Sequence, residues 1–368
     1  QILQEIGKQS LQINSVKKSE RVKKSPLPFT TSTLQQEAAK KLNFATGKTM
    51  RIAQQLYEGV EIKGRGSVGL ITYLRTDSVR ISEEANASAV DYVAAQYGKQ
   101  YVGNNTSKAA TGRKIQDAHE AIRPTDVTLS PVIVKEQLSR DQFRLYQLIY
   151  NRFLASRMAP ARYESESLKL GTKGYEFSAT STKLVFDGFM AVYAMEDEND
   201  ELRNLFKNID EDTNLTVKNW VDKQHFTQPP AHYTEGSLVK QLEELGIGRP
   251  STYAPTISTI LARRYIVKEN RNLYVTELGE AVNQIMRKAF PVIVNTEFTA
   301  NMESLLDNIE EGLIDWKTVV SNFYPDLDEA VKAANEELEH VKIEDEVSDE
   351  ICEECGRNLV VKYGPHGK

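Results

Sequence analysis

The stretch GLITYLRTDS, from Gly69 to Ser78, is the most informative part of the chain. Its apolar first half, extended by Val68, is rich in β-branched residues and predicts a short buried strand. Tyr73 comes near the end of this strand, and strand alternation puts Arg75 on the same face. The stretch therefore predicts a buried scaffold that presents a phenol and a guanidinium together.

Tyr73 and Arg75 have two interpretations. A tyrosine at the end of a buried strand is most often a core residue whose hydroxyl bonds a neighbour. A phenolic oxygen can also attack phosphorus, while a guanidinium neutralises phosphate oxygens through two parallel hydrogen bonds. Asp77 supplies a further polar group. This stretch alone leaves both interpretations open.

A second polar motif, QDAHEAIRPT (Gln116–Thr125), contains His119, one of five histidines in the chain. His119 lies between Asp117 and Glu120. Carboxylates beside an imidazole can keep it protonated, so that it donates to a phosphate. A surface histidine without a role is the simpler alternative.

A third motif, LGIGRPSTYAPTI (Leu245–Ile257), places Arg249, Ser251 and Thr252 at the start of a predicted helix. Free N–H groups and the helix dipole attract anions to such a position, so the motif predicts a phosphate site. Ordinary helix capping by serine or threonine is the alternative.

The surrounding pattern indicates a multidomain α+β protein. Periodicity predicts strands over 9–22, 68–74 and 215–220, a hairpin over 168–179, and helices over 33–42, 48–57, 82–97 and 141–158. Thr33 with Gln36 forms a capping-box pattern for the first helix. Further on, helix 235–245, helix 250–264 and two short strands joined at Arg271 resemble a winged helix-turn-helix.

The charge distribution is uneven. The 368-residue chain has a net charge of −6, but residues 326–354 hold 13 acidic residues and two lysines, so the rest is net positive. A basic run, KKSERVKKS, spans Lys17–Ser25. Charge runs are most often solvated faces. This distribution is compatible with a nucleic-acid partner without requiring one.

The two cysteines, Cys352 and Cys355, form a C-x-x-C pair whose spacing suits half of a tetrahedral zinc site. Two cysteines cannot build a disulfide framework, so we expect a reducing, cytoplasmic location. No apolar run reaches the roughly 20 residues that a membrane span needs. P-loop, H-E-x-x-H and G-x-S-x-G patterns are also absent from the sequence.

Taken together and in order, PFTTSTLQQEAA (Pro28–Ala39), GLITYLRTDS, DAHEAIRP and GIGRPSTYA resemble the signatures of bacterial type IA DNA topoisomerases. The resemblance covers nearly the whole chain and implies a fragment of that family's toroid. It implies an arch domain over 1–31 and 160–229, a gate domain with a nucleophilic tyrosine over 32–159, a helical, winged-helix-like base domain over 230–325, an acidic helix or linker over 326–350, and the start of a zinc ribbon over 351–368.

The resemblance also implies residue roles. Tyr73 would form a 5′-phosphotyrosine link to DNA, and Arg75 would stabilise the scissile phosphate. The residues expected to contact DNA near the cleavage site are His119, Arg249 and Thr252, supported by Asp77 and Ser251. The implied activity is ATP-independent cleavage and rejoining of one strand, which relaxes negative supercoils. The implied partner is single-stranded DNA within negatively supercoiled duplex, bound by a monomer.

One departure from the family pattern affects the cofactors. Family members begin with a Toprim domain that carries a catalytic glutamate, a lysine and a D-x-D-x-E Mg²⁺ site, and no counterpart precedes Gln1. We therefore expect Mg²⁺ to be bound by a domain outside this chain, and the chain alone not to relax DNA. We expect Zn²⁺ only in full-length C-terminal repeats, the first of which Cys352 and Cys355 resemble.

Two other classes of function remain open at this point. The chain could be a DNA-binding module without chemistry, in which the winged helix dominates and Tyr73 is a core residue. It could also be another tyrosine-based nickase or recombinase. Those enzymes add a metal-binding histidine pair or dispersed Arg and His groups, and no matching pattern is found here. A covalent DNA–protein adduct would separate an enzyme from a module.

Overall fold

The computed structural model describes residues 5–7, 10–103, 119–172, 174–193, 213–338 and 346–361. The chain forms two compact units, Gln1–Ala231 (unit 1) and His232–Lys368 (unit 2). Both units mix helices with small antiparallel sheets, as the expected α+β class requires. Among the described helices, none has the length and apolar character to cross a membrane.

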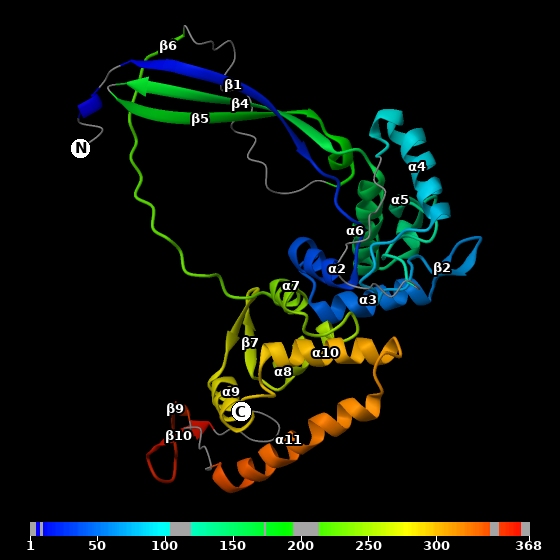
Figure 1. Ribbon diagram of the computed structural model, residues 1–368, viewed down its shortest axis with the longest axis vertical. Coiled ribbons are helices and arrows are strands. Elements are labelled where there is room, and N and C mark those ends of the chain that lie inside the picture. The colour runs from blue at the N-terminus through cyan, green and yellow to red at the C-terminus, as the bar shows by residue number, and fades with distance from the viewer. Residues whose placement is uncertain are drawn as a thin grey trace. The chain divides into compact units, whose positions relative to one another are not determined.

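Unit 1 joins a helical body to a four-stranded antiparallel sheet (Figure 1). The helical segments are α2 (Thr31–Glu37), η1 (Ala38–Leu42), α3 (Thr46–Glu58), α4 (Glu83–Tyr97), η2 (Lys99–Tyr101), α5 (Pro131–Val134), η3 (Lys135–Gln137), α6 (Arg140–Arg157) and η4 (Gly188–Ala191). The strands are β1 (Leu11–Lys23), β2 (Val60–Ile62), β3 (Gly66–Val68), β4 (Ala161–Thr172), β5 (Tyr175–Phe186) and β6 (Asn214–Leu215).

The four-stranded sheet has the order β5-β4-β1-β6, so it brings the N-terminal strand beside a hairpin far along the chain. The β1–β4 ladder runs from the pair Gln12 and Gly171 to the pair Lys23 and Ala161. Few of its side chains are buried: Leu11, Ile13, Ala161, Tyr163, Leu168 and Ser181. The sheet is therefore held mainly by backbone hydrogen bonds and not by an apolar layer.

The core of unit 1 is built around α6. This helix begins with a capping box in which Ser139 accepts from the backbone N–H of Gln142 and the Gln142 side chain accepts in return. Its buried face includes Leu145, Tyr146, Ile149 and Phe153. The same cluster takes in Ile52, Ala53 and Leu56 of α3 and also Leu70, Ile71 and Leu74. The apolar half of the GLITYLRTDS stretch is thus part of this core.

Unit 2 contains the predicted order of two helices followed by a two-stranded hairpin. Its elements are α7 (Glu235–Leu245), α8 (Tyr253–Ala262), β7 (Ile266–Glu269), β8 (Asn272–Val275), α9 (Glu277–Ala289), α10 (Thr296–Glu310), α11 (Trp316–Glu337), β9 (Glu346–Ile351) and β10 (Asn358–Val361). Gly246 ends α7 at a φ of 73°, a left-handed conformation that glycine adopts without strain. The buried cluster here is small and consists of Val239, Tyr253 and Ile257.

Several local predictions differ from the structure. The first helix begins earlier than expected, because Thr30 and Thr33, and not Thr33 and Gln36, form its capping box. The helix predicted from residue 250 begins only at Tyr253, because residues 249–252 form a turn. The strand predicted over 215–220 is limited to Asn214–Leu215.

The acidic segment begins inside a helix, since α11 extends to Glu337. Residues 339–345 lie outside the described part, and the cysteine pair follows β9. The naming of gate, arch and base domains stays a prediction.

Candidate active site

The GLITYLRTDS stretch is not a regular strand, contrary to the prediction for 68–74, and its backbone bends at Thr72, Leu74 and Arg75. β3 ends at Val68, and the stretch makes a single isolated bridge, between Ile71 and Pro124. The backbone N–H of Leu70 donates to Leu56 of α3, and that of Thr72 donates to Arg123. Because its partners change every one or two residues, no continuous ladder forms.

Threonine hydroxyls attach this stretch to both neighbouring segments. On one side, the Thr31 hydroxyl donates to the Leu74 carbonyl at 2.7 Å and accepts from the Thr76 N–H at 2.8 Å. On the other side, the Thr72 hydroxyl donates to the Ala121 carbonyl at 2.7 Å. Tyr73 lies between these attachment points, so its backbone is held from two directions.

Burial alternates along the polar half even without a ladder. Leu74, Thr76 and Ser78 are buried, while Arg75 and Asp77 are exposed. Because the backbone bends at Leu74 and Arg75, strand alternation does not apply, and the expectation that Tyr73 and Arg75 lie on one face stays a prediction. Within the described residues, neither Arg75 nor Asp77 takes part in a salt bridge.

Tyr73 is half-buried between two other rings. The His119 ring lies with its centroid 5.1 Å away and its plane tilted by 32°. The Tyr57 ring meets it edge-on, with a centroid distance of 5.6 Å. In the described part of the chain, no hydrogen bond involves the Tyr73 hydroxyl. This hydroxyl is not among the fully buried polar atoms that lack a partner, so it is open to solvent.

The sequence suggested that Glu120 keeps the His119 imidazole protonated, but the Glu120 carboxylate pairs with Arg123. The carboxylate accepts from the Arg123 Nε at 2.7 Å. Burial raises the pKa of Glu120, but the hydrogen bond and charge of Arg123 and hydrogen bonds from Ser82 outweigh burial and hold that pKa below its ordinary value of 4.5. Asp117, the other carboxylate expected beside His119, lies outside the described residues.

In unit 2, the turn before α8 is closed by Thr252. Its hydroxyl accepts from the Arg249 N–H at 2.8 Å, while its own N–H donates to the Arg249 carbonyl at 2.9 Å. Thr252 is the N-cap residue, but its hydroxyl bonds backward into the turn and not forward into the helix. Ser251 is exposed in the same turn.

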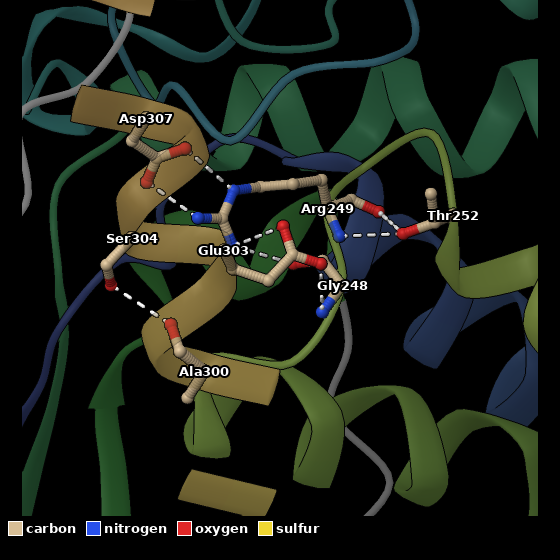
Figure 2. Close-up of polar contacts among 7 residues, drawn as sticks. All are labelled: Gly248, Arg249, Thr252, Ala300, Glu303, Ser304 and Asp307. Atoms are coloured by element: carbon tan, nitrogen blue, oxygen red, sulfur yellow. Dashed lines mark hydrogen bonds and ion pairs between the residues drawn. The ribbon is translucent and has the colours of Figure 1, made fainter. Parts of the chain in front are cut away.

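The Arg249 side chain points toward α10 (Figure 2). Its Nε and Nη2 donate to the two carboxylate oxygens of Asp307, at 3.2 and 2.6 Å. Its Nη1 donates to the Gly248 carbonyl at 2.9 Å and lies 3.4 Å from a Glu303 oxygen. Burial lowers the pKa of Arg249, but Asp307 and Glu303 more than offset this and leave its pKa raised.

Cys352 and Cys355 lie in the turn between β9 and β10 and are not joined in a disulfide. Backbone N–H groups of Cys355 and Glu354 donate to Cys352 and lower the pKa of its thiol. Within the described ranges, no three His, Cys, Asp or Glu side chains gather as a metal ion would require. The described residues therefore do not fit a complete site for Mg²⁺ or Zn²⁺, and both cofactors stay predictions.

The predicted site residues fall into two groups. Tyr73, Arg75, Asp77 and His119 belong to unit 1, and Arg249, Ser251 and Thr252 belong to unit 2. Sequence reasoning missed the contacts made by Tyr57, Glu303 and Asp307. The i, i+4 spacing of the two acidic residues marks one helix face, but nothing in the sequence pairs that face with Arg249.

A family model described as DNA topoisomerase matches residues 1–321 of this chain. A solved structure of full-length topoisomerase I from Thermotoga maritima is similar over 100% of this chain, with 39% identity and a TM-score of 0.81. This chain covers 59% of that protein. The match includes all four motifs around the candidate residues, and the chain belongs to the bacterial type IA DNA topoisomerase family.

Proposed function

We propose that this chain carries the nucleophilic part of an enzyme that cleaves and rejoins one DNA strand through Tyr73 and so relaxes negative supercoils. The observation that carries the proposal is the state of Tyr73 itself. Its ring is held by His119 and Tyr57, while its hydroxyl has no hydrogen-bond partner among the described residues. An oxygen that is positioned but not engaged is available for attack.

In the proposed chemistry the phosphorus keeps two ester bonds throughout, because one ester bond is exchanged for another. The Tyr73 oxygen attacks the scissile phosphorus, a new O–P bond forms, and the bond to the 3′ oxygen of the preceding nucleotide breaks. The phenolic proton is lost, and the departing 3′ oxygen gains a proton. Rejoining is the reverse attack by the 3′ hydroxyl on the phosphotyrosine. Because the ester stores the energy of the broken bond, resealing needs no ATP.

Residues near Tyr73 have distinct parts in this proposal. The exposed Arg75 guanidinium would bind the phosphate oxygens, whose negative charge spreads during attack. His119, beside the Tyr73 ring, would donate to the same phosphate. Single-stranded DNA is the proposed substrate because the phosphate must come within reach of a half-buried phenol, and stacked duplex is less deformable.

The test is to trap the covalent intermediate. We would join the chain to a Toprim domain, which is expected to bind Mg²⁺, and incubate it with an oligonucleotide labelled at either end. Attachment through a 5′ phosphate predicts that the protein keeps a 3′ label and not a 5′ label. Tyr73→Phe removes the attacking oxygen and leaves the ring, so it should abolish the adduct at little cost in stability.

Tyr57→Phe is the matched control, because it removes a hydroxyl from the ring next to Tyr73. It should still form the adduct. An adduct in the Tyr73→Phe variant would show that another residue is the nucleophile. DNA binding without an adduct in any variant would favour the alternative function, a winged-helix binding module formed by α7, α8 and the β7–β8 hairpin.

A further inference from the structure

The Arg249 guanidinium is almost fully occupied by two carboxylates of α10 (Figure 2). Asp307 takes its Nε and one Nη2 bond, while Nη1 is shared between the Gly248 carbonyl and Glu303. Glu303 also accepts from the Gly248 backbone N–H at 3.1 Å. One positive charge thus faces two negative charges, and the cluster has a net charge of −1.

These donors are the ones that a phosphate would use. A guanidinium fork binds carboxylate and phosphate oxygens in the same two-point geometry, and a backbone N–H in a glycine turn is a common anion donor. A phosphate cannot occupy the fork while Asp307 holds it, and the extra negative charge of Glu303 repels a second anion. DNA and α10 must therefore compete for the same site.

We propose that Glu303 and Asp307 fill the phosphate site formed by Arg249 and the Gly248 N–H, and that a DNA phosphate must displace them. The proposal depends on the proposed function only in taking DNA as the ligand. Until DNA binds, carboxylates of the protein itself occupy the predicted phosphate site around Arg249.

The energies make such displacement feasible. The Asp307 side chain is 55% exposed and that of Arg249 is 29% exposed. Exposed ion pairs typically contribute only about 0.2–1 kcal/mol, and solvent screens the Asp307 end of this pair; the Glu303 carboxylate is only 20% exposed and is screened less. α10 has no basic residue of its own, and in the described part of the chain Arg249 is the only ion-pair partner of Glu303 and Asp307. Removing the Asp307 charge therefore frees the fork, and removing the Glu303 charge weakens the repulsion of a phosphate beside it; neither change leaves another cation without a partner.

The experiment measures binding of a fluorescent oligothymidine to the chain by anisotropy across a salt series. Glu303→Gln and Asp307→Asn keep the shape of each side chain and remove its charge. Each should tighten binding about two- to fivefold at low salt, the affinity equivalent of one exposed ion pair. Because wild type makes the same phosphate contact once the carboxylates are displaced, the salt slope should change little in these two variants, whereas Arg249→Ala should make it shallower by about 0.7, the value for one single-strand phosphate contact.

Two controls isolate the role of Arg249. Asp328→Asn in α11 removes the same charge from an exposed ion pair with Lys332 and should leave affinity nearly unchanged. In an Arg249→Ala background, Glu303→Gln and Asp307→Asn should give no gain. Thermal melts of all variants check that each is folded.

The proposal is overturned if Glu303→Gln and Asp307→Asn bind as wild type does or more weakly, which would make the carboxylates braces for Arg249. It is equally overturned if Asp328→Asn gains as much, since net charge would then explain the effect. The adduct assay is independent of this result. A gain in affinity without a Tyr73-dependent adduct would reject the proposed function and retain the competition at Arg249.

Discussion

Gly69 lets the Tyr73 stretch lie against the end of α3. A Cβ atom built on Gly69 would come 2.6 Å from the Tyr57 carbonyl oxygen, closer than any ordinary contact. The opposing atom is backbone, so it cannot swing away as a flexible side chain would. Tyr57 also packs on the Tyr73 ring. The absence of a side chain at Gly69 thus bears on the position of the candidate nucleophile.

We predict that Gly69→Ala both destabilises unit 1 and impairs Tyr73. The overlap should cost about 1–3 kcal/mol in the free energy of unfolding, as small-to-large changes in packed regions do. Gly64→Ala is the control: its φ of 81° disfavours alanine, but no atom lies within 4 Å of the added Cβ. Urea unfolding should show a loss for both variants, whereas only Gly69→Ala should reduce adduct formation. Equal adduct yields would remove Gly69 from the positioning of Tyr73.

The Glu120–Arg123 pair predicts a pH dependence of stability. Because the folded-state pKa of Glu120 lies below its ordinary value of 4.5, the pair stabilises the fold fully above about that pH. The stabilisation is lost as pH falls through the lowered folded-state pKa. Glu120→Gln should therefore lower the urea midpoint at pH 7, and this difference from wild type should shrink as the pH is lowered below 4.5. A difference that stays constant as the pH falls would mean that the carboxylate charge does not stabilise the fold.

Elements with strong local signals were predictable from sequence. Ser82 caps α4 and Gly98 follows its last turn, as the pattern of polar and glycine residues indicated. Gly246 ends α7 in the same way. These signals act over a few residues of backbone, so no knowledge of the tertiary structure is needed to interpret them.

Elements whose form depends on distant partners were not predictable. Thr30, Thr31, Ser32 and Thr33 could each cap α2. Thr30 is the N-cap in the structure, whereas the Thr31 hydroxyl bonds Leu74 and Thr76. The apolar run after Val68 had the composition of a strand, but its hydrogen bonds go first to α3 and to 121–125, and then to Thr31. The composition of a segment indicates whether it is buried. Whether it forms a β-ladder depends on a second extended segment that runs beside it over several residues.

The same distinction applies to the candidate site. Residue types and family motifs pointed to Tyr73, Arg75 and Arg249, and those positions remain the candidates. The ring contact of Tyr73 with His119 and the fork of Arg249 on Asp307 join segments far apart in sequence. Single-sequence patterns hold no information about which segments meet.

At the scale of the whole molecule, the two units differ in their cores. The core of unit 1 includes α3, α6 and the Tyr73 stretch, while the buried cluster of unit 2 consists of three residues. Free energy of unfolding increases with buried apolar surface. We predict two calorimetric transitions, with unit 2 unfolding at the lower temperature.

A pair of core substitutions assigns these transitions. Leu145 in unit 1 and Ile257 in unit 2 are each fully buried. Truncation of either to alanine should cost about 2–5 kcal/mol. Leu145→Ala should lower only the upper transition, and Ile257→Ala only the lower one. A single transition that shifts with both variants would show that the units unfold together.

The sheet of unit 1 has a mechanical consequence. Its three long strands are paired along nearly their whole length, from Gln12 to Lys23 in β1 and from Thr172 to Ala161 in β4. Such ladders resist stretching, because extension must break several hydrogen bonds at once. With few buried side chains on its faces, however, no second layer among the described residues opposes bending out of the sheet plane. The sheet should therefore be stiff when it is stretched along its strands and flexible when it is bent out of its plane.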